Sequence, residues 1–346
     1  MSSVDSDMSW IEIWDGLRES TQPHPAFAGR LTSGSLVFEV TLPASTQESF
    51  VVWQGRSGDA SALQIWRTRT GSIVLRHGDV GAETRDQFVE AGDLLSVKYS
   101  WDATNRTSLI EFTNCVHNTV HRGCVGPPVP LRAETVLPGS DFDMCNHHFA
   151  GVADHALRSM TISGFGPGTP IETPDGPRPI ELLQPGMRVC TGGNGVQTVR
   201  WVSRQEVLAR GQNVPVQLRA PYHGVPTDVI VTRSQRILFT GPDIEYLFGQ
   251  EAVFARAGDL INGKSARLDQ RRSTQVIHQI MLDAHETVLV GRCRMETVLL
   301  GELVASEGRT NLALSKVDQE TAYQTLDRAA AQAMMAQMIE HRRISA

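Results

Sequence analysis

A short stretch, CVHNTVHRGC at residues 115–124, brings thiols and imidazoles close together in the sequence. Thiolates and imidazoles are the ligands that zinc prefers in a tetrahedral site. The spacing makes Cys115, His117, His121 and Cys124 candidate zinc ligands, and CNHH follows at residues 145–148. The alternative is a surface loop with a few histidines and one or two buried thiols, or a Cys115–Cys124 disulfide in an exported protein.

The acidic turn GSDFD at residues 139–143 is a candidate calcium loop, because carboxylates at positions i and i+2 can converge on a hard cation. Two carboxylates are too few to complete a site, so the alternative is a pair of solvated loop charges.

The elements that must position these residues are strands. Apolar and β-branched runs recur roughly every 10–15 residues with no helical period between them, which is typical of a two-sheet sandwich or jelly roll. The expected strands are 36–42, 50–53, 63–67, 95–101, 109–112 and 155–162. This spacing, together with the segment AGDLLSVKYSWDATNRTSLIEF, resembles a concanavalin-like or laminin-G-like sandwich, here expected over residues 8–160.

From Gly164 onward, short strands alternate with Pro-Gly turns, which predicts a second all-β domain. Asn194-Gly195 is the strongest hairpin signal, because both residue types tolerate a positive φ. It lies between the expected strands 188–191 and 196–201.

The C-terminal segment differs from the rest. Residues 318–341 contain no Pro or Gly, and Tyr323, Leu326, Ala330, Met334 and Met338 recur at steps of three and four. This pattern predicts an amphipathic α-helix over 318–343 with Asp318 as its N-cap. Its apolar stripe is expected to dock on the second domain or on a partner chain, which would make an oligomer through the helix.

The sequence FGPGTPIETPDGPRPIELLQPGMRV, starting at Phe165, follows the pattern F-x-x-G-T-x-I-x-T-P-x-G-x-R-P-V-E-x-L-x-P-G-D-x-V except at two positions: Ile180 stands where the pattern has Val, and Met187 where it has Asp. It resembles the start of a bacterial Hint (hedgehog/intein) domain. The resemblance runs from residue 164 to about residue 305, and the domain is expected to span 164–310. A lectin-like sandwich followed directly by a Hint domain also resembles a known bacterial domain pairing.

The resemblance implies an autoprocessing chemistry. In such domains a Cys at the first position attacks the preceding carbonyl, an N-to-S acyl shift (N-to-O where the nucleophile is a hydroxyl). A Thr and a His in a T-x-x-H arrangement hold the scissile amide and protonate its departing nitrogen. A later region with Asp and His assists breakdown of the ester.

In this chain the position of the nucleophile is Gly164, which has no side chain to attack with. The T-x-x-H element falls on TRSQ, where Thr232 is kept and Gln235 replaces the His. Ser163 is the nearby hydroxyl, but a shift of one residue along a strand points a side chain to the opposite face. Both halves of the first step are therefore expected to be lost.

The later element survives as HQIMLDAHE, with His278, Asp283 and His285. Asp283 and His285 are either a working acid–base pair, as the resemblance implies, or residues that now brace a loop through hydrogen bonds.

Length, composition, charge and the N-terminal sequence argue against a nucleic-acid-binding or membrane-spanning protein. A length of 346 residues with 40% hydrophobic residues indicates two folded domains. A net charge of -6 with scattered Lys and Arg argues against a nucleic-acid partner. The N-terminus has no basic region followed by an apolar run, and no apolar stretch is long enough to span a bilayer. Five cysteines are an odd number, so we expect a cytoplasmic protein, or one exported without a cleaved N-terminal signal.

We therefore expect an all-β protein that binds or scaffolds. Its sandwich would present a surface to a glycan or protein ligand, and its Hint fold would be a processing-deficient module with no cofactor apart from the candidate zinc. The alternative is an autoprocessing protein that cleaves near Ser163–Gly164.

Overall fold

The structure is a computed structural model that describes residues 10–15, 18–21, 29–44, 48–56, 63–138, 146–157, 163–193, 195–299 and 323–344. The chain divides into two compact units, Met1–Arg158 and Ser159–Ala346. Both are built mainly from antiparallel strands, which confirms the all-β fold class. None of the helices in the described ranges is long and apolar enough to cross a membrane.

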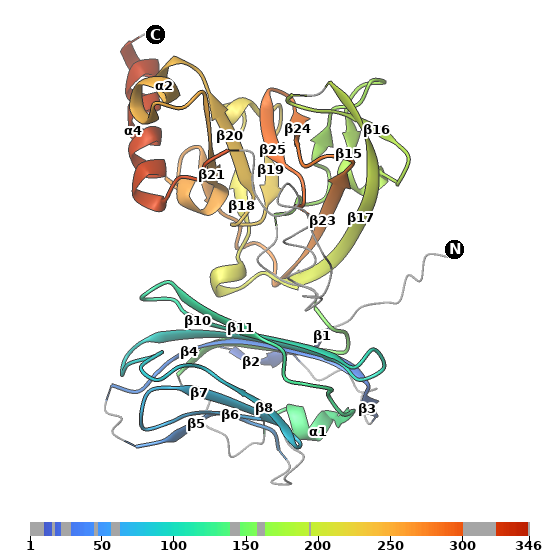
Figure 1. The fold of residues 1–346 in the computed structure, drawn as a ribbon, viewed down its shortest axis with the longest axis vertical. Helices are drawn as coiled ribbons and strands as arrows, with labels where there is room; N and C mark the ends of the chain where they lie inside the picture. The colour runs from blue at the N-terminus through green and yellow to red at the C-terminus, as the bar shows by residue number, and fades with distance from the viewer. Residues whose placement is uncertain are drawn as a thin grey trace. The chain divides into compact units, whose positions relative to one another are not determined.

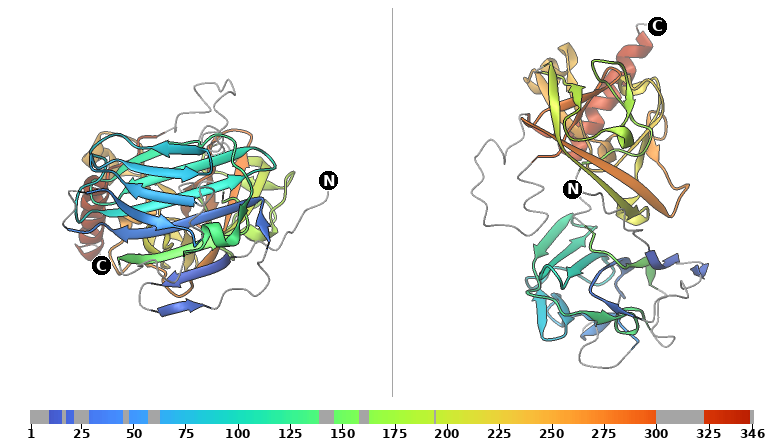
Figure 2. Two further views of the ribbon diagram at one scale, coloured as in Figure 1. Left: turned by 90° about the horizontal axis from the view of Figure 1, so that it is seen from below. Right: turned by 90° about the vertical axis from the view of Figure 1, so that its right-hand side faces the viewer.

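The first unit is a sandwich of two antiparallel sheets (Figure 1, Figure 2). Among the described residues, the larger sheet has its strands in the following order, in which neighbours are hydrogen-bonded: β11 (Thr119–Gly123), β10 (Thr107–Asn114), β9 (Leu94–Asp102), β4 (Ser33–Thr41), β13 (His147–Ala153), β1 (Trp10–Asp15) and β2 (Arg18–Thr21). The smaller sheet contains β5 (Phe50–Gln54), β6 (Leu63–Arg67), β7 (Ile73–His77) and β8 (Val80–Glu83). A short pair, β3 (Arg30–Leu31) with β12 (Leu131–Arg132), and helix α1 (Ala133–Val136) complete it.

Apolar side chains from both sheets form one core. Phe38 and Phe112 of the larger sheet share a cluster with Trp53 and Ile65 of the smaller sheet. In β6 the side chains at positions 63, 65 and 67 are buried and the two between them are half-buried, the alternation that the sequence predicts. The predicted strand at 155–162 is different: the larger sheet uses β13, residues 155–157 are not in a strand, and residues 158–162 lie outside the described residues.

The second unit contains several small sheets. One joins β16 (Arg188–Cys190), β17 (Val196–Leu208) and β23 (Thr274–Leu282), and a second joins β19 (Val229–Val231), β18 (Val216–Leu218) and β22 (Ala266–Leu268). A third joins β21 (Ala252–Arg256), β20 (Arg236–Thr240), β25 (Cys293–Glu296) and β24 (Thr287–Val290), and β14 (Pro170–Ile171) pairs with β15 (Arg178–Pro179). Helix α2 (Pro242–Phe248) and the short 3-10 turns Ile180–Leu182, Gly211–Asn213, Tyr222–Gly224 and Ala257–Leu260 connect them.

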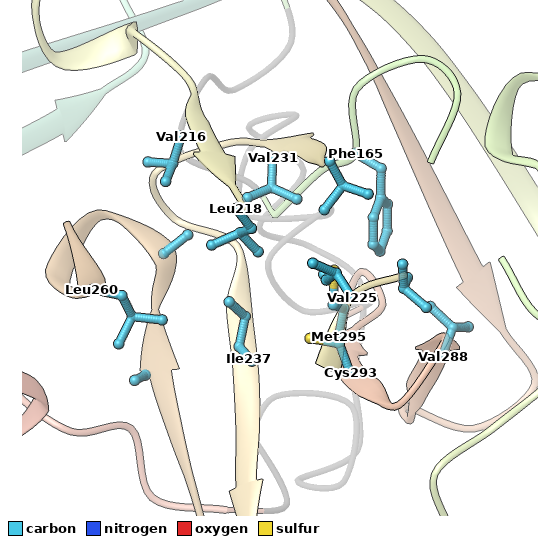
Figure 3. Packing of buried hydrophobic residues seen from close by; sticks show 14 of the residues in the cluster. Phe165, Val216, Leu218, Val225, Val231, Ile237, Leu260, Val288, Cys293 and Met295 are labelled. Atoms are coloured by element: carbon cyan, nitrogen blue, oxygen red, sulfur yellow. The ribbon is translucent and has the colours of Figure 1, made fainter. Parts of the chain in front are cut away.

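The predicted hairpin is confirmed. β16 and β17 are antiparallel, with Val189 opposite Gln197, and Gly195 has a φ of 75° that favours glycine. A large apolar cluster contains buried residues from each of these sheets; Figure 3 shows Phe165, Val225, Val231 and Met295 within it.

The C-terminal helix α4 covers Arg328–Ile344 and begins ten residues after the predicted Asp318. Asp327 is its N-cap: the carboxylate accepts a hydrogen bond from the Ala330 amide at 2.8 Å. Residues 323–327 are held away from helical geometry, because the Leu326 amide donates to the Phe254 carbonyl at 2.7 Å. Met334 is buried in the cluster of this unit, so the apolar stripe docks on its own domain, and α4 lies beside α2 (Figure 1).

Candidate functional site

The segment 163–166 runs between two strands that belong to different sheets. Phe165 forms antiparallel bridges to Val231 of β19 and to His278 of β23. The Phe165 amide donates to the His278 carbonyl at 2.8 Å, and the His278 amide donates to the Phe165 carbonyl at 2.7 Å. On the other side, the Gly166 amide donates to the Ile230 carbonyl at 2.7 Å and the Thr232 amide to the Gly164 carbonyl at 3.0 Å. The backbone at the predicted cleavage point is therefore fixed on both sides.

The side chain of Phe165 anchors this segment. It is 1% exposed and lies in the apolar cluster with Val225 and Val231 (Figure 3). Burial of a whole phenyl ring is worth roughly 1.5–3 kcal/mol by area alone. This apolar anchor fixes the residue that follows the Ser163–Gly164 peptide bond.

Side chains hold both polar atoms of the Ser163–Gly164 peptide group. The Gly164 amide donates to the hydroxyl of Thr232 at 3.1 Å, the contact that the T-x-x-H resemblance implies for the Thr. The Ser163 carbonyl accepts a hydrogen bond from Nε2 of Gln279 at 3.1 Å. The sequence analysis did not identify Gln279, because the spacing of residues does not show which side chain of β23 faces the Ser163–Gly164 bond. This bond is called the junction below.

Gly164 has no room for a side chain. A Cβ added there would overlap Cγ2 of Ile277 and would lie 3.2 Å from the His278 carbonyl oxygen. The φ of Gly164 is outside the left-handed region, so the backbone conformation itself accepts any residue. Space, not backbone geometry, excludes a nucleophile at this position.

Gln235 is fully buried, and its amide group points to β25. Nε2 donates to the carbonyls of Glu296 at 2.9 Å and of Arg236 at 3.1 Å. Both hydrogen atoms of this amide are therefore used by backbone carbonyls, and Oε1 has no hydrogen-bond partner among the described residues. An amide also has no proton that it can give up near neutral pH, so Gln235 cannot do the work of an imidazole.

Asp283 and His285 have different partners. The Asp283 carboxylate pairs with Arg200 at the surface, and this hydrogen bond raises the pKa of Arg200. His285 is nearly buried, with Nε2 3.1 Å from Oε1 of Glu296, although the two atoms are not in hydrogen-bonding geometry. The acid–base role of the two residues stays a prediction.

Glu296 is the centre of a buried ionic cluster. Its side chain is fully buried and pairs with Nε of Arg236, which is 11% exposed. Together with the contact to His285 and the hydrogen bond from Gln235 to its carbonyl, Glu296 joins two of the predicted site residues. The sequence contained no signal for this role, because a single Glu in an apolar strand fits many environments.

His278 contributes its backbone to the junction, while its ring titrates abnormally. Burial lowers the pKa of His278, the charge of Glu181 raises it and that of Arg204 lowers it. Burial is the largest of these effects, so the environment favours the neutral ring.

The four candidate zinc ligands belong to the β10–β11 hairpin and the residues that flank it. Asn114 lies opposite Thr119 and Ile110 opposite Gly123, so Cys115 is at the turn and Cys124 at the far end. Five residue steps along a strand span about 17 Å, which is too far for one ion or a disulfide. His117 lies 3.8 Å from an Asp93 carboxylate oxygen, and the His121 ring packs near Phe112.

Cys115 and Cys124 are not joined to each other by a disulfide. Within the described ranges no three His, Cys, Asp or Glu side chains form a group that could hold a metal ion. The hairpin therefore does not bring the predicted ligands together. The acidic turn at 139–143 lies outside the described residues.

One part of the chain matches a known domain family. Residues 163–302 match the family model of the Hint domain. No curated protein matches the chain. The second unit therefore contains a Hint domain, and the match begins at Ser163, whose carbonyl accepts the hydrogen bond from Gln279.

The chain is similar to several solved structures. One is a bacterial intein-like domain from Clostridium thermocellum, at 17% identity and a TM-score of 0.28, covering 39% of this chain and 97% of that one. Another is the enzymatically active domain of tailspike protein 2 from bacteriophage CBA120, at 10% identity and a TM-score of 0.24, covering 37% of this chain and 20% of that one. A third is the LG1-3 region of the laminin alpha2 chain, at 9% identity and a TM-score of 0.24, covering 84% of this chain and 56% of that one.

Proposed function

We propose that the Hint domain of this protein is processing-deficient and that the protein acts in binding or scaffolding through its lectin-like sandwich. The observation that carries this proposal is Gly164. An acyl shift needs a sulfur or oxygen within reach of the Ser163 carbonyl carbon. Gly164 supplies neither, and Ile277 leaves no space for one.

Gln235 supports the same conclusion. Departure of the amide nitrogen needs a proton donor, and Gln235 spends both its N–H groups on carbonyls of the β20–β25 region. Each loss alone is expected to cost orders of magnitude in rate, and losses within one catalytic unit do not add.

The sandwich is the part that we propose to bind a ligand, either a glycan or a protein. Its two-sheet architecture and the segment at 91–112 are similar to laminin-G-like and lectin-like domains, which is a likeness of fold and not of a site. Helix α4 uses its apolar stripe within its own domain, so self-association through that stripe would require the helix to undock.

The intact mass of the full chain, purified with protease inhibitors and incubated with dithiothreitol, tests the processing deficiency. We expect one species at 38.0 kDa throughout the incubation. Products of about 18 and about 20 kDa, the masses expected for a cut between the domains, would show that the proposal is wrong. A glycan array probed with the full chain tests the binding role, and specific binding that an excess of the free glycan abolishes supports it.

An autoprocessing protein that cleaves near Ser163–Gly164 is the second candidate. The contact of the Thr232 hydroxyl with the Gly164 amide favours it, because this half of the T-x-x-H element is in place. The Ser163 hydroxyl would have to serve as nucleophile, and it donates a hydrogen bond to the Ser234 carbonyl oxygen at 3.4 Å. An acyl shift onto this hydroxyl would move the acyl group of Ile162, so the bond that breaks would be the one that precedes Ser163. Its cleavage would produce the same two fragments with a new terminus beside residue 163.

A further inference from the structure

We propose that Gln279 positions and polarises the Ser163 carbonyl, and that the Cγ2 methyl of Ile277 occupies the space of the missing nucleophile. In this proposal the Ser163–Gly164 bond lies in an acyl-transfer site that one methyl group blocks. The hydrogen-bond donor to the Ser163 carbonyl is still present. This inference rests on the proposed processing deficiency and extends it to two residues of β23.

The case for Gln279 is its direct contact with the reacting atom. Its Nε2 lies 3.1 Å from the Ser163 carbonyl oxygen, and the bond is buried. When a nucleophile adds to a carbonyl, negative charge develops on that oxygen, and a fixed N–H donor at this distance stabilises the charge. The Thr232 hydroxyl accepts a hydrogen bond from the nitrogen of the same peptide group, so one side chain binds its N–H and the other its carbonyl oxygen.

The case for Ile277 is its position. Its side chain is buried but is not part of the apolar cluster that holds this domain together. The Cβ of a residue at position 164 would overlap Cγ2 of Ile277. A methyl on a β-branched side chain cannot swing away easily, because few χ1 rotamers are available to it. The contact of the added Cβ with the His278 carbonyl, at 3.2 Å, needs only a shift of a few tenths of an ångström.

A thiol at position 164 would react as follows. Its sulfur attacks the Ser163 carbonyl carbon, and the oxyanion of the tetrahedral intermediate accepts the hydrogen bond from Gln279. The carbon–nitrogen bond then breaks, and the thiol proton passes to the departing nitrogen through an imidazole at position 235. The products are a thioester at residue 163 and a free amine at residue 164. Dithiothreitol then attacks the thioester carbon and displaces the protein thiol, which releases the first 163 residues.

The test uses full-length chains that carry G164C and Q235H. Ile277→Ala in this background removes the obstructing Cγ2 methyl, whereas Ile277→Val keeps both γ carbons and is the matched control. We expect the chain with Ile277→Ala to give two products in dithiothreitol, and the chain with Ile277→Val to be at least about tenfold slower. Equal rates, or a folded chain with Ile277→Ala that stays whole, would overturn the role of Ile277.

The role of Gln279 is tested in the chain that carries G164C, Q235H and Ile277→Ala. Gln279→Leu removes the donor and is expected to slow cleavage by about a hundredfold or more. Gln279→Glu donates only while its carboxyl group is protonated, so its rate should fall as the pH rises through the pKa of that carboxyl. Gln275→Leu is the matched control: Gln275 is also buried in β23, but its Nε2 donates to the Val276 carbonyl. If Gln279→Leu cleaves as fast as Gln275→Leu, Gln279 does not position the carbonyl.

A stability cycle tests the steric part without any chemistry. Gly164→Ala should lower the melting temperature of the otherwise unchanged chain, and it should lower it less in the Ile277→Ala background. Additive shifts would overturn the steric proposal. Cleavage of the unmodified chain would contradict the proposed function instead, which keeps the two failures distinguishable.

Discussion

Replacing Glu296 with Gln removes a fully buried negative charge while keeping the shape of the side chain. The Arg236 guanidinium, which is almost buried, then loses its counter-charge, and His285 loses the carboxylate beside it. Removing one partner of a buried ion pair costs about 3–5 kcal/mol, because the remaining charge stays in a region of low dielectric constant. We expect the second unit to lose that much of its free energy of unfolding.

Native-state hydrogen exchange measured by mass spectrometry separates this unit from the sandwich. A loss of about 3–5 kcal/mol speeds the slowest-exchanging amides of β20 and β25 by about two to four orders of magnitude. Amides of the sandwich serve as the internal reference and should not change. The matched control is Asp283→Asn, which breaks the exposed pair with Arg200 and should change little because water screens those charges. If Glu296→Gln exchanges no faster than Asp283→Asn, the buried pair does not stabilise this domain as argued.

Three further outcomes follow from the burial of single groups. Phe165→Ala removes the ring that anchors the junction and should destabilise the second unit by about 3–5 kcal/mol, measured by the same exchange method; an unchanged unit would contradict the anchor. Burial raises the pKa of the Cys293 thiol to about 12, so this thiol should resist alkylation at pH 8 in the folded protein, while the exposed Cys124 reacts. Burial is also the main cause that lowers the pKa values of His77 and His278 in the folded protein. At acidic pH the two imidazoles therefore bind protons more readily in the unfolded chain than in the folded one. Their contribution to stability is present above about pH 6.5 and is lost as the pH falls, which denaturant melts at pH 5 and pH 7 should show; equal stability at both would contradict it.

The parts of the fold that the sequence predicts correctly are those encoded locally. The alternation in β6 and the Asn-Gly signal between β16 and β17 depend on neighbouring residues alone, and both predictions are confirmed. The predicted start of α4 was wrong because contacts with a distant part of the chain decide where the helix begins. Two aspartates nine residues apart both suit an N-cap, and backbone hydrogen bonds with Phe254 select Asp327.

The site was predictable only in part. The motif identifies Gly164 and Gln235 as the positions where the Hint pattern has Cys and His, because both departures can be read from the sequence. Ile277 and Gln279 were missed, because the register between the junction and β23 joins residues more than a hundred positions apart. The zinc prediction rests on the short spacing of its ligands in the sequence, whereas an extended hairpin with this spacing separates Cys115 from Cys124.

The most direct test of the central claim is peptide mapping of the bond between residues 163 and 164. Freshly purified full-length protein, digested after denaturation, should yield a peptide that contains Ile162, Ser163 and Gly164, in the same amount before and after treatment with a thiol. A peptide that begins at Ser163 or at Gly164, growing with incubation time as the spanning peptide disappears, would contradict the account.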